Sequence, residues 1–151
     1  MDTRTPTARG KTLLIVEDDI LPAMALRDEL EDAGYRVLDL IGRHQEARQA
    51  ARTFKPDLAL VNIQLHGRDD GIELARELRE LGIPSLFISG QTTYAKSAQS
   101  AAIASLPKPY SPVDAVKAVA FLLGRQAGDR SLPCPPGLQL FGEAPGEATA
   151  A

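Results

Sequence analysis

Polar side chains that could take part in chemistry follow several short apolar runs of the chain. The acidic pair Glu17 and Asp18 follows one run, and Asn62 closes another. Ser89 and Lys108 come after two further runs. Two neighbouring carboxylates suit Mg²⁺, which prefers carboxylate, carbonyl and water oxygens. A metal ion, a lysine and a hydroxyl together neutralise the oxygens of a transferring phosphoryl group, so these residue types suit phosphoryl chemistry.

Each of these side chains also has an ordinary explanation when it is taken alone. An acidic loop before a helix stabilises the helix dipole, a serine starts turns, and a lysine is a solvated charge by default. The interpretation as a site therefore depends on whether the fold brings these side chains together.

Strand and helix signals alternate along the chain. Short apolar or β-branched runs predict five strands, at 12–16, 37–41, 58–61, 86–88 and 103–106. Between them apolar residues recur at helical spacing, and the last helix begins with a serine cap at Ser111 followed by Pro112. This alternation predicts an α/β fold, in which a parallel sheet is covered on both faces. Sites in such sheets form at the carboxyl ends of the strands, where the polar residues above are expected.

Composition and charge exclude several classes of protein. The 151 residues are 44% hydrophobic and 25% charged, enough for one domain with its own core. With 17 Lys and Arg against 20 Asp and Glu, the net charge of −3 argues against a nucleic-acid-binding surface. The longest apolar run has six residues, at 118–123, too short for a membrane span. One cysteine, Cys134, excludes an internal disulfide, so we expect a cytoplasmic protein.

The two ends of the chain differ from its middle. We expect 1–10 to be a flexible leader, 11–124 to be the folded domain, and 125–151 to be a flexible tail. Pro, Gly and Ala make up 13 of the 27 tail residues, a composition typical of irregular chain. The alternative is that three apolar residues of the tail dock on the domain or on a neighbouring chain: Leu138, Leu140 and Phe141.

Five motifs, in this order, resemble the receiver domain of two-component response regulators over about residues 11–124. They are Leu-Leu-Ile-Val-Glu-Asp-Asp, Pro-Asp-Leu-Ala-Leu-Val-Asn, Asp-Gly-Ile-Glu-Leu, Phe-Ile-Ser-Gly and Leu-Pro-Lys-Pro-Tyr. The resemblance implies a flavodoxin-like, doubly wound sheet of five parallel strands in the order 2-1-3-4-5, with helices on both faces. It also implies a histidine kinase or histidine phosphotransferase as partner, and a downstream protein target.

The resemblance also assigns a metal site. Glu17 and Asp18 match the acidic pair that holds Mg²⁺, and Asn62 stands at the phosphoacceptor position beside the metal. Gln64 matches the position whose backbone carbonyl completes the metal shell.

A phosphoryl-binding and switch pair follows from the same comparison. Ser89 matches the hydroxyl residue that binds the phosphoryl group, and Lys108 matches the lysine that contacts it. The peptide bond between Lys108 and Pro109 is cis in the family and is expected to be cis here.

Asn62 departs from the family, which has aspartate at this position. A carboxylate can attack the phosphorus of a phosphohistidine, whereas an amide oxygen is a poor nucleophile because the nitrogen lone pair is delocalised. The sequence therefore predicts a chain that is not phosphorylated by the family route, with Mg²⁺ binding weakened by the lost charge. Either the natural protein carries aspartate and this chain is an engineered variant, or the chain is a natural pseudo-receiver.

A second departure concerns the output of the signal. The family often has an aromatic residue three positions before the lysine, and here that position is Ser105. The stretch from Ser89 to Lys108 is short and rich in small polar residues, which predicts a shortened fourth helix at about 94–101. The usual aromatic coupling is therefore in question; Tyr94 could supply an aromatic ring, although a surface tyrosine is the simpler interpretation.

These observations leave two functional hypotheses. The leading one is a stand-alone receiver, not an enzyme, that takes part in a phosphorelay through protein contacts as a monomer or weak homodimer. The alternative is a pseudo-receiver, a protein-binding module that does not depend on phosphorylation. A flavin- or nucleotide-binding enzyme is disfavoured, because the loop after the first strand is acidic and has no glycine.

Overall fold

A computed structural model of the chain describes residues 10–64, 70–89 and 96–141. The strands in this part are β1 (Thr12–Val16), β2 (Arg36–Ile41), β3 (Leu58–Asn62), β4 (Ser85–Ser89), β5 (Ala104–Pro107) and β6 (Gln139–Leu140). The helices are α1 (Ile20–Asp32), α2 (His44–Phe54), α3 (Asp70–Glu80), α4 (Lys96–Ala101) and α5 (Pro112–Gln126).

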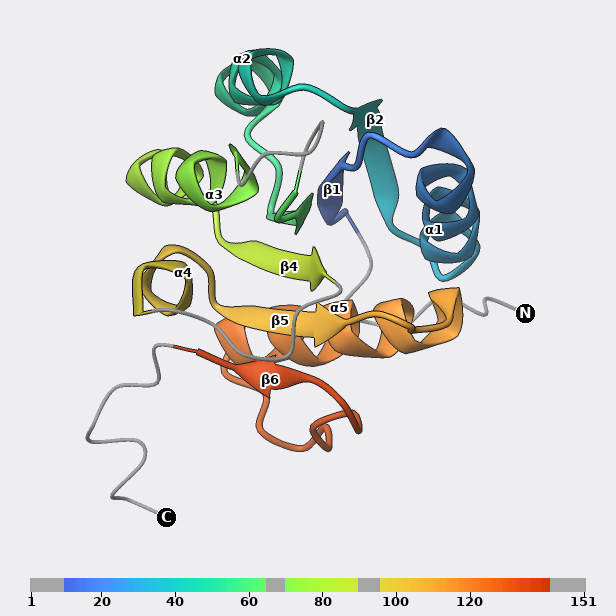
Figure 1. Cartoon of the computed structure of the whole chain (residues 1–151). Coiled ribbons are helices and arrows are strands. Elements are labelled where there is room, and N and C mark those ends of the chain that lie inside the picture. The colour runs from blue at the N-terminus through green and yellow to red at the C-terminus, as the bar shows by residue number, and fades with distance from the viewer. Residues whose placement is uncertain (1–9, 65–69, 90–95, 142–151) are drawn as a thin grey trace.

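The strands form one sheet in the order β2-β1-β3-β4-β5-β6 (Figure 1). The first five strands pair in parallel, which confirms the predicted doubly wound α/β fold and its 2-1-3-4-5 order. Their carboxyl ends therefore meet at one edge of the sheet, which we call the carboxyl edge. The fourth helix is short, with six residues, as predicted.

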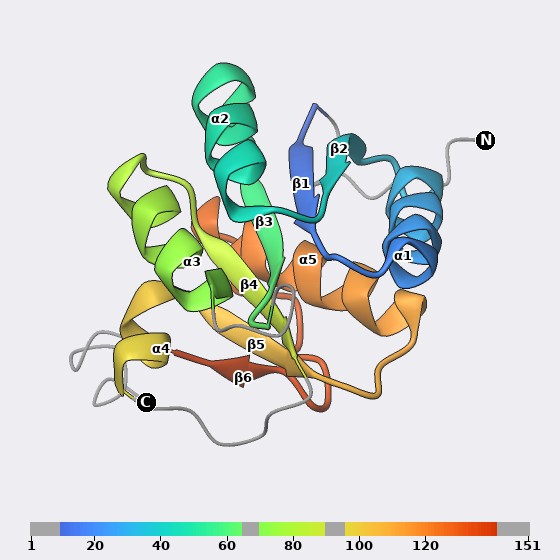
Figure 2. The same cartoon turned by 45° about the horizontal axis from the view of Figure 1, so that its top comes forward.

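Both faces of the sheet are covered, by α1 and α5 on one side and by α2, α3 and α4 on the other (Figure 2). Successive residues of β1 show why, because Leu13 and Ile15 join the core under α1 and α5, whereas Leu14 and Val16 join the core under the other helices. A strand buried on both faces is continuously apolar. The polar residues that end such strands are consequently conspicuous in the sequence.

The start of α5 carries the predicted cap. The Ser111 hydroxyl accepts a hydrogen bond from the Asp114 amide at 3.1 Å, and the Asp114 carboxylate accepts one from the Ser111 amide at 3.0 Å. This reciprocal pair is a capping box, and the bonds from Ser111 hold the pKa of Asp114 below its usual value. The cap fixes where the chain between β5 and α5 ends.

The sheet has a sixth strand that was not predicted. β6 pairs antiparallel with β5, joining Leu140 to Ala104 and Gln139 to Ser105. Leu138 is buried, and helix α5 continues to Gln126. The expected boundary at residue 124 is therefore wrong for residues 125–141, which follow the alternative of docking on the domain.

The sequence does not predict β6 because a strand of two residues, Gln139 and Leu140, is too short to show an alternating pattern. β6 is held by hydrogen bonds to the edge of β5 and by burial of its apolar neighbours, which composition alone does not reveal. Residues 1–9 and 142–151, and Tyr94, lie outside the described residues. None of the helices in the described ranges is long and apolar enough to cross a membrane.

Candidate functional site at the carboxyl edge

The carboxyl edge brings together side chains from four parallel strands. Glu17 and Asp18 directly follow β1, Asn62 and Ser89 end β3 and β4, and Lys108 directly follows β5. The strands are in register at this edge, since Asn62 pairs with Ile88 and Ser89 pairs with Pro107. The candidates at this edge are Glu17, Asp18, Asn62, Ser89 and Lys108.

Glu17 is the centre of the site, and only 4% of the residue is exposed. Its Oε2 accepts a hydrogen bond from Asn62 Nδ2 at 2.8 Å, and its Oε1 accepts one from Lys108 Nζ at 3.1 Å. A buried carboxylate is costly unless a counter-charge and hydrogen bonds compensate it. Lys108 supplies the counter-charge, and Asn62 supplies a second donor.

Asn62 is 9% exposed and is oriented by this contact. Only the nitrogen of an amide can donate to a carboxylate, so Nδ2 faces Glu17 and Oδ1 is directed elsewhere. An aspartate at this position would have no donor for Glu17, and the two carboxylates would repel each other.

The backbone on both sides of Glu17 fixes its position. Its amide donates to the carbonyl of Ile41 at 2.9 Å, which extends the pairing of β1 and β2 by one residue. Asp18 is exposed, and a Cβ at Gly42 would lie 3.2 Å from the Asp18 Cα, so glycine allows the chain after β2 to pass close to the acidic loop. The Asp19 amide also donates to Glu17 Oε2, at 3.4 Å.

Gly71 holds the end of β3 from the other side. Its amide donates to the Ile63 carbonyl at 2.9 Å, and a Cβ at this position would lie 2.1 Å from the Asn62 carbonyl oxygen. Only a residue without a side chain allows this approach. The first turn of α3 therefore positions the backbone of residues 62–63, a role that the sequence analysis did not assign to the glycine in Asp-Gly-Ile-Glu-Leu.

Lys108 is tied to the neighbouring strand through its backbone. Its amide donates to the carbonyl of Ser89, and Ser89 itself is 3% exposed. The peptide bond between Lys108 and Pro109 is cis, as the resemblance implies. The Lys108 side chain is 38% exposed, so it reaches Glu17 from the solvent side of the edge.

Tyr110 is a site neighbour that the sequence analysis quoted in a motif but gave no role. It packs against the core under α1 and α5. Burial raises the pKa of Tyr110 well above its usual value, and the negative charge of Glu17 raises this pKa further. The phenol therefore stays neutral within reach of the Glu17 charge; its position two residues after the lysine is the signal that could have indicated it.

Gln64 lies two residues after Asn62, its side chain is exposed, and 65–69 lie outside the described residues. The role implied for it uses only a backbone carbonyl, so an exposed side chain is compatible with that role. In the part of the chain that is described, no three side chains of Asp, Glu, His or Cys gather as a metal centre.

The donor set nevertheless fits Mg²⁺. This ion keeps several waters and is commonly held by one or two carboxylates, which Glu17 and Asp18 provide at adjacent positions. The neutral Asn62 supplies only a carbonyl oxygen, and Lys108 already pairs with Glu17. The residues therefore fit a weak magnesium site.

Comparisons with known proteins identify relatives of this chain. The chain is 30% identical over 127 residues to the transcriptional regulatory protein PdtaR of Mycobacterium tuberculosis. The aligned region covers 82% of this chain and 62% of PdtaR. It is 31% identical over 108 residues to the uncharacterized transcriptional regulatory protein YbdJ of Bacillus subtilis, covering 69% of this chain and 47% of YbdJ. The chain thus spans between about half and three fifths of the length of these relatives.

Solved structures show the same fold. The signal receiver domain of a modulated diguanylate cyclase from Desulfovibrio desulfuricans G20 is 32% identical, with a TM-score of 0.69 over 77% of this chain and 95% of that domain. A CheY-like response regulator receiver domain protein from Methanospirillum hungatei JF-1 is 26% identical, with a TM-score of 0.72 over 78% of this chain and 97% of that protein.

Residues 13–120 match the family described as the response regulator receiver domain. Domains of this family are signalling modules that generally bind Mg²⁺ in an acidic pocket and interact with histidine kinases or phosphotransfer proteins. This match covers most of the chain and includes every candidate residue at the carboxyl edge. The chain therefore belongs to the response regulator receiver domain family of two-component signalling.

Proposed function

We propose that this receiver domain acts through contacts with other proteins and that position 62 does not accept a phosphoryl group. The observation that carries the proposal is the hydrogen bond from Asn62 Nδ2 to Glu17 Oε2, at 2.8 Å. At the end of β3, where the family has a nucleophilic carboxylate, this chain has an amide whose nitrogen is engaged as a donor. An amide does not form the acyl phosphate that a carboxylate forms.

The remaining residues of the edge support an origin as a working receiver. Glu17 and Asp18 would hold Mg²⁺ with the carbonyl oxygens of Asn62 and Gln64, and the ion would neutralise charge on a phosphoryl group. In this proposal Lys108 and Ser89 would contact such a group. With Asn62 in place, these parts lack the attacking oxygen.

An apolar surface beside the site supports a protein as partner. The first turn of α1 exposes Ile20 (56%) and Leu21 (73%), and the first turn of α5 exposes Val113 (48%). Both helices begin at the carboxyl edge and pack against each other (Figure 2). Exposed apolar side chains on neighbouring helix ends can serve as a protein-interaction site, so we propose that a histidine kinase or histidine phosphotransferase docks on these two helix starts.

A second candidate function is a binding module that works without phosphorylation. The contacts among Asn62, Glu17 and Lys108 favour it, because the buried carboxylate is satisfied with no metal ion or phosphoryl group. In this case the domain holds one conformation, and a partner recognises that conformation directly.

Intact-mass spectrometry tests the proposed chemistry. The chain and an Asn62→Asp variant are incubated with Mg²⁺ and acetyl phosphate, with Asn62→Ala as the matched control. We expect a phosphoryl adduct on the aspartate variant alone. An adduct of equal yield on the unaltered chain, mapped to any residue of the carboxyl edge, contradicts the proposal.

Partner binding separates the two candidate functions. Affinities of the chain and of Asn62→Asp for a cognate histidine phosphotransferase are measured with and without beryllofluoride. Equal affinities under all conditions support the phosphorylation-independent module. Leu21→Glu should weaken binding at least tenfold, whereas Phe54→Glu, on an aromatic residue that is 54% exposed at the end of α2, should leave it unchanged.

A further inference from the structure

Residues 127–141 form a segment, here called the C-terminal strap, that leaves α5 and returns to the free edge of β5. β6 lies in the strap and pairs antiparallel with Ala104 and Ser105 of β5. The Phe141 amide then donates to the Ile103 carbonyl at 2.9 Å. Without the strap, β5 would be the edge of the sheet and would present unpaired backbone groups.

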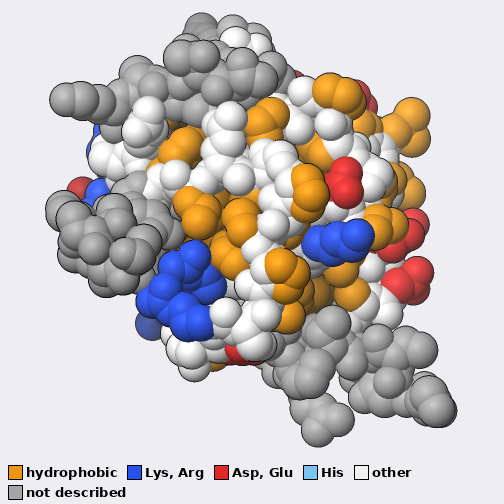
Figure 3. Space-filling view, turned by 90° about the horizontal axis from the view of Figure 1, so that it is seen from below, with side chains coloured by type: hydrophobic (Ala, Val, Ile, Leu, Met, Phe, Trp, Pro, Cys, Tyr) orange, Lys and Arg blue, Asp and Glu red, His pale blue; other side chains and the backbone are white. Residues whose placement is uncertain are grey.

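Side chains of the strap contact both cores of the domain. Leu138 is 9% exposed and belongs to the core under α1 and α5, against which Leu132 and Leu140 also pack. Phe141 packs against the other core. The space-filling view from below shows hydrophobic side chains gathered on the side of the molecule where β6 and α5 lie (Figure 3).

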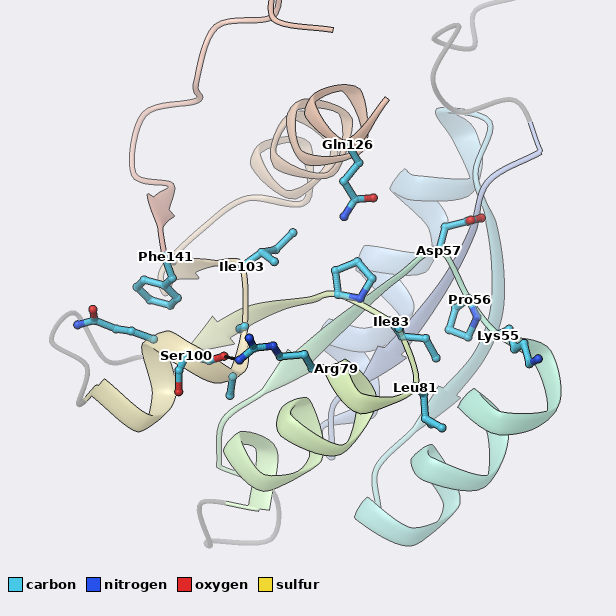
Figure 4. A pocket seen from close by; sticks show the side chains of 15 residues that line it. Lys55, Pro56, Asp57, Arg79, Leu81, Ile83, Ser100, Ile103, Gln126 and Phe141 are labelled. Atoms are coloured by element: carbon cyan, nitrogen blue, oxygen red, sulfur yellow. Dashed lines mark hydrogen bonds between the residues drawn. The ribbon is translucent and has the colours of Figure 1, made fainter. Parts of the chain in front are cut away.

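Phe141 also borders a cavity at the amino ends of the strands, opposite the carboxyl edge. The cavity has a volume of about 860 Å³, and Phe141 and Ile103 lie close together on one side of it (Figure 4). Arg79 closes another side by donating to the Ser100 carbonyl at 2.5 Å. The end of the strap is therefore a wall of this cavity, and its departure would widen the opening.

The attachment of the strap is short compared with that of the other strands. β6 has two residues, whereas each central strand has five, from β1 through β3 to β4. The connection from α5 is largely exposed at Pro133, Cys134 and Pro136. Segments with few buried contacts and exposed connections open at lower free energy than the core.

We propose that the edge of β5 is a strand-binding surface. The C-terminal strap occupies this surface, and a segment of another protein can displace it. The strap itself defines the partner that fits: an extended protein segment that runs antiparallel to β5. Such a segment carries leucine-like side chains two residues apart, at the places of Leu138 and Leu140, and an aromatic side chain next to the second. Binding by strand addition takes its affinity from backbone hydrogen bonds and its specificity from alternate side chains.

This surface is distinct from the carboxyl edge, so the proposal does not depend on the chemistry at Asn62. Because the strap is part of the same chain, it competes at an effective concentration on the order of millimolar. A free segment of the same affinity cannot displace it at micromolar concentration. The experiment therefore weakens the strap within the full chain and supplies its sequence separately.

The test uses the full chain with Leu138→Asp, which places a charge in the core. Pro133→Asp is the matched control, because it adds the same charge at an exposed position of the strap. A fluorescent peptide of residues 129–141 is the probe, and its affinity is measured by anisotropy. Hydrogen exchange of the Phe141 amide reports strap opening, and the amides of β1 report the core.

In Leu138→Asp we expect the hydrogen of the Phe141 amide to exchange at least tenfold faster than in the unaltered chain, while exchange of the β1 amides is unchanged. We also expect this variant to bind the peptide at least tenfold more tightly than the unaltered chain or Pro133→Asp does. A peptide with serine at the two leucine positions should not bind. If the Phe141 amide of the unaltered chain exchanges only together with the β1 amides, this result overturns the claim that the strap can be displaced. Loss of the whole fold in Leu138→Asp would overturn the same claim. An opened strap with no peptide binding overturns the strand-binding surface.

Discussion

The side-chain amide of Asn62 donates a hydrogen bond of 2.8 Å to the carboxylate of Glu17, the residue that begins the acidic loop of this receiver domain. Lys108 holds the other oxygen of the same carboxylate, at 3.1 Å. Asparagine at this position therefore lacks the carboxylate that an aspartate would have, and its amide is a donor that stabilises a buried acid. The missing negative charge weakens the attraction of the site for a divalent ion.

Asn62→Asp should consequently be less stable than the present chain when no divalent ion is present. The loss of the hydrogen bond and the added repulsion between carboxylates should cost about 1–3 kcal/mol. Mg²⁺ at ten to a hundred times its dissociation constant should return about 1.4–2.7 kcal/mol by mass action. Urea unfolding of both proteins, with EDTA and with 10 mM Mg²⁺, measures the difference.

Asn62→Ala separates the two contributions, because it removes the donor without adding a charge. Mg²⁺ should recover less of its loss of stability than in Asn62→Asp, because only Glu17 and Asp18 remain as carboxylates to hold the ion. If Mg²⁺ stabilises the alanine and aspartate variants equally, the ion does not bind at residue 62.

The present chain should bind Mg²⁺ weakly, through Glu17 and Asp18. Losing one carboxylate near a divalent ion should weaken binding by about 1–3 kcal/mol after screening, which raises the dissociation constant about 5- to 150-fold. A titration followed by NMR should shift the amides of residues 17 and 18. Asp18→Asn should abolish these shifts, and Asp19→Asn, its exposed neighbour, should preserve them. Absence of any shift at 20 mM Mg²⁺ in the present chain refutes the metal assignment.

The central fold and the carboxyl edge could be predicted from the sequence because their signals are local. Each strand is a short apolar run closed by a polar residue, and α5 begins with the capping residues Ser111 and Pro112. Parallel pairing then places every strand end at one edge, so Glu17 and Lys108 meet although 91 positions separate them. The comparison with other receivers supports the same arrangement.

The C-terminal strap could not be predicted, because its signals depend on tertiary structure. Leu138 and Leu140 stand in a segment rich in Pro and Gly, and β6 exists only because β5 offers an unpaired edge. The role of Gly71 also depends on tertiary structure, since the need for glycine comes from the carbonyl oxygen of Asn62, nine positions earlier in the chain. Composition alone favours a flexible tail.

Gly71→Ala should destabilise the domain strongly. The new Cβ would lie 2.1 Å from the Asn62 carbonyl oxygen and 2.7 Å from the Ile63 Cα, so the end of β3 and the first turn of α3 must separate. Overpacking against backbone atoms should cost at least about 2 kcal/mol. Urea unfolding measures this loss.

Gly42→Ala is the graded control for that substitution. Its Cβ would lie 3.2 Å from the Asp18 Cα, which small shifts can accommodate, so the loss should stay below about 1 kcal/mol. Equal losses in the two variants would mean that α3 does not hold residue 62 as tightly as the contacts indicate.

Tyr110 should give the domain a measurable sensitivity to high pH. Burial and the charge of Glu17 raise the pKa of Tyr110 in the folded chain, while an unfolded tyrosine titrates near about 10. Above that pH the unfolded chain loses the phenol proton and the folded chain retains it, so stability falls as the pH rises. Tyr110→Phe should remove this part of the fall, and urea unfolding at pH 9, 10 and 11 compares the two slopes.

Ultraviolet difference titration provides the direct measurement of the same group. The signal of Tyr110 is the absorbance change near 295 nm that the unaltered chain shows and Tyr110→Phe lacks. This change should appear only well above pH 10. Glu17→Gln should move it to lower pH, because the negative charge that opposes ionisation is gone. A Tyr110 transition centred at pH 10, unmoved by Glu17→Gln, would show that the phenol does not sense the carboxylate and that Tyr110 lies outside the site.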